Sequence, residues 1–385
     1  MTTAESRPRR VVHVTRRFHP MPGGIERYVL GLAVAQARAG HHVTVITLDR
    51  DVLGVRAGRL PAEEWVEGVH VRRLPGIGAQ RFAATFRLDQ LVRAVAQSDV
   101  THLHDLRFMT GTVAATAAAR RRPLVFHTHG LLYHTSFATR LKHFMVRRYY
   151  GPWLRGARAW AVASSAPDRD MLLADVPELR GRTVTFENAL DLDAFMALRR
   201  SPEPGLVVVS GRVAPHKGID DLLASLAMID GVPWRLEIAG TENRVERNRL
   251  DGIVSRLGLA PRVAFCGEYT DVEYLQRLSR AAVAAFPSRA EGFGLALLEA
   301  LASGVPVVAR AQPGHRDVLG AGLTDRFVDF GDHAAGAAAL SSALLLSPEA
   351  AAELGERERE RARVFELPRL VGEIEGLYAR IMGAR

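Results

Sequence analysis

The 385-residue sequence contains a single cysteine, Cys266, so an intrachain disulfide is impossible and a cysteine-based zinc site is excluded. No apolar run reaches the roughly 18 residues that a membrane-spanning helix needs. The opening residues, MTTAESRPRR, lack the apolar core of a signal peptide. These absences predict a protein of the reducing cytoplasm. Lysine is also scarce, because Lys142 and Lys217 are the only two and arginine supplies the remaining basic charge.

The length predicts two domains, since a single hydrophobic core stops growing at about 250–300 residues. Hydrophobic residues make up 48% of the chain and charged residues 24%, as in soluble globular proteins. The formal net charge is +9. Taken alone, this charge is typical of proteins that bind nucleic acid, an anionic membrane surface or phosphorylated ligands.

The positive charge is confined to the first half of the chain. Residues 1–200 contain 30 Lys and Arg against 17 Asp and Glu, whereas residues 201–385 contain 21 against 25. Within the first half, residues 106–167 carry ten basic residues and neither Asp nor Glu. This segment indicates a surface for an acidic partner, with genomic base composition as the alternative cause of the arginine excess.

The segment 106–167 interleaves its arginines with aromatic residues, which suits nucleic acid or a lipid surface. Nucleic acid is disfavoured, because the sequence holds no helix-turn-helix, RNP or zinc-finger motif. A basic amphipathic surface on anionic lipid is a partner hypothesis, but the alternative of a solvated helix face, whose arginines hold substrate or nothing, is slightly favoured over it. The residues that would form this surface are Arg140, Lys142, Arg147, Arg148, Arg155, Phe137, Phe144 and Tyr149.

Short buried strands alternate with amphipathic helices along the whole chain, which predicts an α/β fold of two tandem, doubly wound, Rossmann-like domains. A helix is expected over 25–40, after the first strand. We expect strands at 11–15, 43–48, 69–74, 99–104, 123–129 and 157–164, and again at 206–212, 234–240, 262–268, 283–288 and 305–309.

The Pro-containing polar stretch 190–205 predicts a linker. The domains are therefore expected at 1–190 and 205–365, with a C-terminal helix, 366–385, that packs back toward the N-terminal domain. Ligands of such sheets bind at the carboxyl ends of strands, and the cleft between two domains is the expected site.

Two motifs that follow strands suit a phosphate. The pair Gly23-Gly24 lies between the first strand and its helix, where backbone N–H groups and the helix dipole favour an anion. The alternative is a plain tight turn. Arg212 and Lys217 flank the turn after the strand at 206–212, and both side chains are suited to phosphate oxygens. Two solvated loop cations are the alternative there.

The segment EGFGLALLEALASG carries two glutamates, Glu291 and Glu299, separated by seven residues. Glu291 follows a strand, and Glu299 stands inside an otherwise apolar helix, where a lone charge favours a ligand over a surface role. Carboxylates accept hydrogen bonds from sugar hydroxyls, and the N–H groups of Phe293, Gly294 and Leu295 suit an anion. In the alternative, Glu291 only complements the helix dipole.

The strand end FHTHG places His127 and His129 on one face of a strand. The sequence shows no further metal ligands for this pair, and His129 is the better placed for a cleft. Three Asp-x-Asp strings, Asp49/Asp51, Asp168/Asp170 and Asp191/Asp193, match the pattern of a divalent-metal site. They fall at loops and helix starts, where Asp is favoured anyway, so no metal is expected.

Five motifs in this order resemble the nucleotide-sugar-dependent, retaining glycosyltransferases of family 4, which have the GT-B fold. They are GGIER, HTHG, ENALDLDAF, GRVAPHKG and EGFGLALLEALASGVPVVA, the last being that family's E-x7-E signature. The resemblance implies transfer of a hexose-type sugar from a nucleotide diphosphate sugar to an acceptor hydroxyl on a lipid-linked, cell-envelope or small-molecule acceptor. It implies retention of configuration, no metal or other cofactor, and a cytoplasmic enzyme, and enzymes similar to it often act on lipid-linked acceptors at the inner membrane face. A non-catalytic sugar-nucleotide-binding protein is the alternative.

The resemblance also implies a role for each matched residue. Gly23 and Gly24 close over the donor diphosphate, which Arg212 and Lys217 hold. Glu299 binds the ribose, and His129, with His127 as the competing choice, lies near the 6-position of the sugar. Glu291 grips the transferred sugar together with the backbone of Gly292, Phe293, Gly294 and Leu295. Asn188 is expected on the acceptor side, although Asn188-Ala-Leu-Asp191 replaces the family's usual Asn-Gly-Val-Asp.

Overall fold

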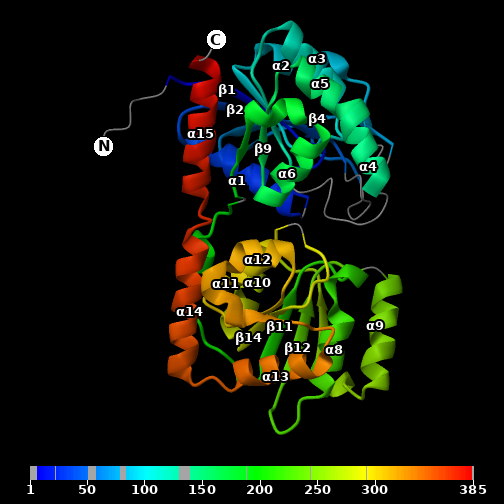
Figure 1. Cartoon of the computed structure of the whole chain (residues 1–385), viewed down its shortest axis with the longest axis vertical. Helices are drawn as coiled ribbons and strands as arrows, with labels where there is room; N and C mark the ends of the chain where they lie inside the picture. The colour runs from blue at the N-terminus through cyan, green and yellow to red at the C-terminus, as the bar shows by residue number, and fades with distance from the viewer. Residues whose placement is uncertain are drawn as a thin grey trace. The chain divides into compact units, whose positions relative to one another are not determined.

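The structure is a computed structural model of the chain that describes residues 7–21, 23–50, 58–78, 84–129, 139–187, 189–242, 244–291 and 293–383. It divides into two compact units (Figure 1). The first unit comprises Met1–Leu190 together with Leu367–Arg385, and the second comprises Asp191–Glu366.

The first unit is built on an eight-stranded sheet in the order β10-β9-β8-β7-β1-β2-β4-β3. All its neighbouring strands pair in parallel except β3 and β4, which are antiparallel. The chain order reverses between β1 and β7, as at the switch point of a doubly wound sheet. The strands are β1 Arg10–Val14, β2 His42–Leu48, β3 Glu63–Val66, β4 Val69–Leu74, β7 Val100–Leu103, β8 Leu124–His127, β9 Trp160–Ala163 and β10 Thr183–Thr185, beside the small pair β5 Gly76–Ile77 and β6 Ala84–Thr85.

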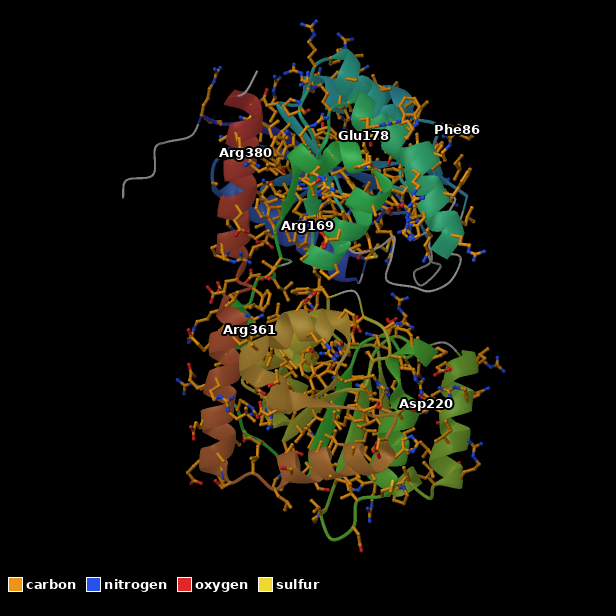
Figure 2. All side chains as sticks on the ribbon, in the orientation of Figure 1. Phe86, Arg169, Glu178, Asp220, Arg361 and Arg380 are labelled. Carbon is orange, nitrogen blue, oxygen red and sulfur yellow. The ribbon has the colours of Figure 1, made fainter. Side chains whose placement is uncertain are left out.

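Helices and two hydrophobic cores complete the first unit. Helix α15 comes from the end of the chain, yet its buried Leu370 and Ile374 share a core with Leu32 of α1. At the other end of α15, Arg380 lies 4.5 Å from the ring centre of Trp160 (Figure 2). The helices are α1 Gly24–Arg38, α2 Leu88–Gln97, α3 Thr110–Ala119, α4 Thr139–Met145, α5 Gly151–Gly156, α6 Ala166–Asp175 and α15 Leu367–Gly383, with a π-helical turn at Val146–Tyr150.

The second unit is built on a six-stranded parallel sheet in the order β13-β12-β11-β14-β15-β16. Its switch point lies between β11 and β14. The strands are β11 Leu206–Ser210, β12 Arg235–Ala239, β13 Val263–Gly267, β14 Val283–Phe286, β15 Val307–Arg310 and β16 Phe327–Val328. The helices are α7 Asp193–Met196, α8 Ile219–Ala227, α9 Arg244–Arg256, α10 Asp271–Arg280, α11 Leu295–Ala302, α12 Pro313–Leu319, α13 His333–Leu344 and α14 Pro348–Arg363.

The stretch 191–204 packs into the second unit, where the sequence predicts a linker. Phe195 of α7 is buried, and the Arg200 guanidinium donates to the backbone carbonyls of Ala281 and Gly304. These contacts extend the second unit fourteen residues further toward the N-terminus than the expected start at 205. A Pro-containing sequence signals where regular structure stops, but it does not reveal which core the irregular chain covers.

Among the described residues, no single helix is long and apolar enough to cross a membrane. The helices α13 and α14 meet the length and composition criterion only as a pair, and the chain bends by 107° between them.

The packing of α15 makes a stability prediction. Leu370→Ala should lower the free energy of unfolding by about 2–5 kcal/mol, because it removes a fully buried side chain and leaves a cavity. Arg369→Ala is the matched control on the same helix, and the loss of its half-exposed pair with Glu373 should cost less than about 1 kcal/mol. Urea unfolding of the two variants measures both values. Equal, small losses would show that α15 does not belong to this core.

Candidate functional site

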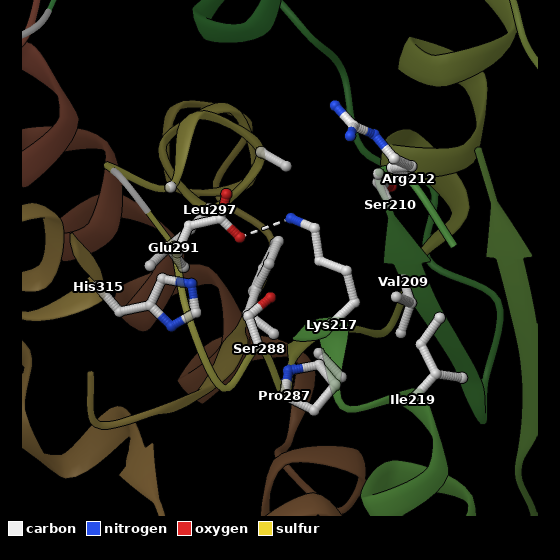
Figure 3. A pocket seen from close by; sticks show the side chains of 15 residues that line it. Val209, Ser210, Arg212, Lys217, Ile219, Pro287, Ser288, Glu291, Leu297 and His315 are labelled. Atoms are coloured by element: carbon white, nitrogen blue, oxygen red, sulfur yellow. Dashed lines mark hydrogen bonds and ion pairs between the residues drawn. The ribbon is translucent and has the colours of Figure 1, made fainter. Parts of the chain in front are cut away.

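A pocket opens at the switch point of the second sheet, where the ends of β11 and β14 diverge. Four of the predicted donor-binding residues lie in this one pocket: Arg212, Lys217, Glu291 and Gly294 (Figure 3). The other side chains around them include Ser210, Ile219, Ser288, Leu297 and His315.

Lys217 and Glu291 form the charged centre of this pocket. The Lys217 Nζ donates to Glu291 Oε2 at 2.5 Å, and the two side chains are 17% and 22% exposed. Burial by itself raises the pKa of Glu291, but the Lys217 ammonium and the groups of His315 and Ser288 outweigh it, so the pKa of Glu291 lies below its usual value. Arg212 is exposed beside this pair, which leaves its guanidinium accessible to a ligand.

His315 of α12 lines the same pocket, and sequence reasoning missed it. Burial lowers its pKa to about 4, and its Nδ1 lies 3.0 Å from the carbonyl oxygen of Arg310. The ring is therefore neutral and donates from Nδ1. Gly294 makes room for it, because a Cβ at Gly294 would lie 3.0 Å from the ring and the backbone φ of 96° favours glycine. No sequence motif surrounds His315 that could have found it.

Glu299 is buried in α11 and does not line the pocket. Its carboxylate lies close enough to Tyr274 of α10 to help burial raise the pKa of that phenol, and Ser210 at the end of β11 is a neighbour of the same hydroxyl. Glu299 thus stands behind one pocket residue, Ser210, rather than in the pocket itself. Its predicted contact with a ribose stays a prediction.

The remaining residues predicted to contact the donor or the acceptor divide into two groups. Phe293 packs its ring edge-on against Phe365, and neither Phe293 nor Leu295 lines the pocket. Gly292 and Asn188 lie outside the described residues. Their predicted ligand contacts stay predictions.

The glycine pair Gly23-Gly24 begins α1, as predicted, but a side chain of this protein already lies there. A Cβ at Gly23 would lie 2.0 Å from Oε2 of Glu26. The Glu26 carboxylate is buried and pairs with Arg17 at 2.7 Å, and burial raises its pKa. The acidic side chain of Glu26 thus complements the positive end of the α1 dipole from within the protein. The predicted contact of Gly23 and Gly24 with a phosphate stays a prediction.

The first unit gathers five histidines at its own switch point. His127 and His129 stack with ring centres 4.0 Å apart, which confirms that they share a face. Their three companions, which the sequence motifs did not indicate, come from β1 and from the end of β7: His13, His102 and His104. The string THLHD carries a signal, because histidine at alternate strand positions places imidazoles on one face. The lone histidine of VVHVT carries none.

These imidazoles are neutral. Burial lowers the pKa of His13 to about 4 and of His129 to about 3, and it places the pKa values of the other three well below the usual range. His129 is 8% exposed, whereas His127 is fully buried, which favours His129 as the residue that meets a ligand. His129 also has a φ of 50°, an uncommon backbone conformation that concentrates at functional positions.

The Asp-x-Asp strings serve local structure in the described residues. Asp49 accepts from the backbone N–H of Gly76, and Asp168 accepts from the Thr128 hydroxyl. Asp191 accepts from the N–H of Asp193, and Asp51 lies outside the described residues. The groups of three metal-type ligands found in the described residues consist of histidine alone: His13, His102 and His104, and His104, His127 and His129.

Both halves of the chain match known families. Residues 194–361 match the family described as "Glycosyl transferases group 1", and residues 23–186 match the "Glycosyl transferase 4-like domain". Each match covers most of one compact unit, and the match over 194–361 includes the switch point between β11 and β14.

Relatives that align over most of the chain are named as glycosyltransferases. A GDP-mannose:cellobiosyl-diphosphopolyprenol alpha-mannosyltransferase from Xanthomonas oryzae pv. oryzae is 31% identical over 311 residues, and the alignment covers 79% of each chain. A protein of the same name from Komagataeibacter xylinus is 28% identical over 97% of this chain and 94% of its own. A D-inositol 3-phosphate glycosyltransferase from Mycolicibacterium smegmatis is 26% identical, over 97% and 92%.

Solved structures share the fold. Sucrose-phosphate synthase from Thermosynechococcus elongatus superposes with a TM-score of 0.75 at 24% identity and covers 98% of this chain and 100% of its own. Anabaena HepE, in complex with UDP and glucose, gives 0.73 at 18% identity over 97% and 100%. Together with the two doubly wound units, these likenesses confirm the predicted GT-B fold.

The buried histidines predict a pH dependence of stability. The unfolded chain protonates its histidines near pH 6.5, but folded His129 does so only near pH 3. Between these values the unfolded state binds more protons, so acidification lowers the free energy of unfolding by up to about 1.4 kcal/mol per pH unit for this group. His129→Gln removes that contribution.

The difference in free energy of unfolding between wild type and His129→Gln, measured in urea from pH 7 to pH 4.5, isolates it. Buried Glu26 and Glu358, whose raised pKa values act in the opposite sense, are present in both proteins and cancel. A difference that does not change with pH would contradict a neutral, buried His129.

Proposed function

The chain belongs to the group 1, family 4-like glycosyltransferases, which transfer a sugar from a nucleotide sugar, and we propose that it is a retaining, metal-independent mannosyltransferase. The proposed donor is GDP-mannose and the proposed acceptor a hydroxyl of a polyprenyl-diphosphate-linked oligosaccharide. The observation that carries the proposal is the meeting of Arg212, Lys217 and Glu291 in one pocket at a sheet switch point.

The cations of the pocket supply positive charge for the departing nucleoside diphosphate. When the glycosidic bond breaks, negative charge develops on the nucleoside diphosphate, and fixed positive charge lowers the energy of that state. The Lys217 ammonium is held by Glu291, and the Arg212 guanidinium is accessible and suited to fork onto phosphate oxygens. These two cations take the place that a divalent ion has in other sugar transfers, which supports the proposal that no metal is required.

The transferred sugar is assigned to the side of the pocket formed by Glu291 and α11. A carboxylate accepts hydrogen bonds from two sugar hydroxyls, and Glu291 stays ionised because its pKa is lowered. Neutral His315 adds a bare Nε2 beside it. The sugar becomes oxocarbenium-like as the diphosphate departs, and in the retaining scheme the acceptor attacks from the same face while a donor phosphate oxygen takes its proton.

The relatives' names support the choice of substrates. The relatives from Xanthomonas and Komagataeibacter are named alpha-mannosyltransferases that use GDP-mannose and a diphosphopolyprenol-linked sugar. The alignments with these relatives cover 79–97% of the chain. Mannose is a hexose, the class of sugar that the resemblance to family 4 implies.

A single assay tests donor, transfer and stereochemistry. Purified protein with GDP-mannose and a polyprenyl-diphosphate disaccharide in EDTA should yield an α-mannosylated product, whose configuration NMR reports. Lys217→Ala should lower kcat by about 10²–10³-fold, because it removes a preorganised cation from the leaving group. Lys142→Ala, at the chain's other lysine, is the matched control and should leave transfer to a detergent-solubilised acceptor unchanged.

Several outcomes discriminate between the alternatives. Thermal stabilisation by GDP-mannose over UDP-, ADP- and dTDP-sugars identifies the donor, since a ligand of the native state raises its stability. Stabilisation without any transfer favours the non-catalytic binding protein. A β-linked product excludes retention, loss of activity in EDTA excludes metal independence, and wild-type turnover of Lys217→Ala excludes the role of that lysine.

We also propose that the enzyme meets its lipid-linked acceptor at the cytoplasmic face of an anionic membrane, through one surface of the first unit. Exposed aromatic and aliphatic side chains project there among arginines, with Phe144 60%, Tyr149 56% and Trp153 41% exposed. The α4–α5 surface consists of Arg140, Leu141, Phe144, Arg148, Tyr149 and Trp153.

The charge of this surface is smaller than the sequence indicates. Arg147 pairs with Asp175 and Arg155 pairs with Glu178, a residue labelled in Figure 2. Arg140 and Arg148 have no ion pair with another described residue. The remaining cations beside exposed aromatic rings match the charge and polarity of an anionic lipid surface. Phe137 lies outside the described residues.

Vesicle cosedimentation tests the α4–α5 surface. Wild type should bind phosphatidylglycerol vesicles at low salt, and Arg148→Glu should weaken binding about tenfold or more, since each charge near the surface contributes about 1 kcal/mol. Phe144→Ser should also weaken binding, whereas Phe86→Ser, at an 81% exposed phenylalanine labelled in Figure 2, should not. Failure of wild type to bind, or equal binding to neutral phosphatidylcholine vesicles, removes the anionic-membrane proposal.

A further inference from the structure

Three of the buried histidines form a continuous hydrogen-bonded row. His13 Nδ1 lies 2.9 Å from His104 Nε2, and His104 Nδ1 lies 3.0 Å from His129 Nε2. At the inner end, His13 Nε2 lies 2.7 Å from Oε1 of Gln36, a fully buried residue of α1. We call this set, Gln36, His13, His104 and His129, the imidazole chain.

The geometry of the imidazole chain is that of hydrogen bonds and not of a metal chelate. The linked rings are within 25° and 29° of coplanar, and their centres are 5.2 and 5.3 Å apart. In each linked pair, the distance between the ring centres exceeds the distance between the facing nitrogens by about two ring radii. The facing nitrogens therefore lie on the line that joins the two ring centres. A zinc ion bound tetrahedrally at about 2.0–2.1 Å from each of two nitrogens would hold them about 3.3–3.4 Å apart. The observed separations of 2.9 and 3.0 Å are shorter than that and match hydrogen bonds.

A carboxylate beside Gln36 fixes the direction in which the hydrogen bonds of the imidazole chain are donated. Gln36 Nε2 donates to Oε1 of Glu375 at 2.8 Å, and Glu375 lies on α15. A carboxylate in a salt bridge, here with Arg9 at 2.6 Å, only accepts hydrogen bonds. The amide of Gln36 must therefore turn its NH₂ to Glu375 and its oxygen to His13, which donates from Nε2.

The direction propagates because each neutral imidazole carries one N–H. His13, protonated on Nε2, accepts at Nδ1 from Nε2 of His104. His104 in turn accepts at Nδ1 from Nε2 of His129. The imidazole chain ends at Nδ1 of His129. This atom has no hydrogen-bond partner among the described residues, and it belongs to the least buried of the five histidines.

We propose that Glu375 on α15 sets, through the imidazole chain, the tautomer of His129, with Nε2 protonated and Nδ1 bare. Glu375, Gln36, His13 and His104 are then positioning residues. The group of the substrate that His129 contacts must be a hydrogen-bond donor, such as a sugar hydroxyl, because a bare nitrogen repels a phosphate oxygen. Only this last consequence rests on the proposed function.

The neighbouring rings pack against the imidazole chain but form their own hydrogen bonds elsewhere. His102 stacks on His104 and His127 stacks on His129, with ring centres 4.3 and 4.0 Å apart. Their Nδ1 atoms face the hydroxyls of Tyr378 and Tyr28 instead. The low pKa of His129, about 3, makes it a weak base, so its bare Nδ1 orients a hydroxyl and does not remove its proton at neutral pH.

Long-range ¹H–¹⁵N NMR of the full chain labelled with ¹⁵N-histidine tests the tautomers directly. At pH 7 the rings of His13, His104 and His129 should each show a protonated Nε2 and a bare Nδ1. In Glu375→Gln the new amide can also donate to Gln36, which permits the reverse direction, and His129 should show both tautomers. Glu373→Gln removes the same charge from the same helix, where the carboxylate pairs with Arg369, and should leave one tautomer.

A kinetic readout accompanies the spectra. If about half of the Glu375→Gln molecules carry the reversed tautomer, KM for the donor should rise about twofold with kcat nearly unchanged, since only the competent fraction binds. An Nδ1-protonated His129 in wild type, a single tautomer in Glu375→Gln, or stoichiometric zinc in the purified protein overturns the proposal. The wild-type spectrum needs neither substrate nor variant, so an enzyme that transfers no mannose would overturn the proposed function and leave the tautomer assignment intact.

Discussion

Parallel strand pairing is the constraint on which both halves of this protein depend. Parallel strands end at the same edge of a sheet, and a reversal of chain order separates the loops that follow two neighbouring strands. In the first unit that reversal lies between β1 and β7, which bring His13 and His104 together. In the second it lies between β11 and β14, whose ends line the pocket of Lys217 and Glu291. Residues more than seventy positions apart meet there because the sheet topology requires it.

The two switch points use burial in opposite ways. In the second unit, partial exposure keeps Lys217 and Glu291 charged, and their mutual attraction lowers the pKa of the carboxyl despite its burial. In the first unit, burial keeps the five imidazoles neutral, and hydrogen bonds join three of them, His13, His104 and His129. The first arrangement suits an anion, whereas the second suits a hydroxyl.

Tertiary structure also changes how the net charge is understood. The sequence shows an acid-free segment over 106–167, yet Asp175 and Glu178 follow it closely and fold back onto Arg147 and Arg155. What remains is a smaller basic patch among exposed aromatic side chains. A linear count of charges misses this neutralisation, because ion pairs depend on distance in space and not on distance along the chain.

The sequence by itself determined the class of fold, the position of most strands and the motifs of the second unit, since these depend on local periodicity and on residues close to a strand end. It predicted Lys217 and Glu291 as ligand residues, and the structure places them in one pocket. It did not reveal His315, the burial of Glu299 behind Ser210, or the packing of residues 191–204 on the second unit. Only the tertiary structure decided these points, and it alone joined Glu375 of the last helix to His129 through Gln36 and two strands. Each of them is a contact between distant segments, which the pairing of strands and helices creates and no local pattern encodes.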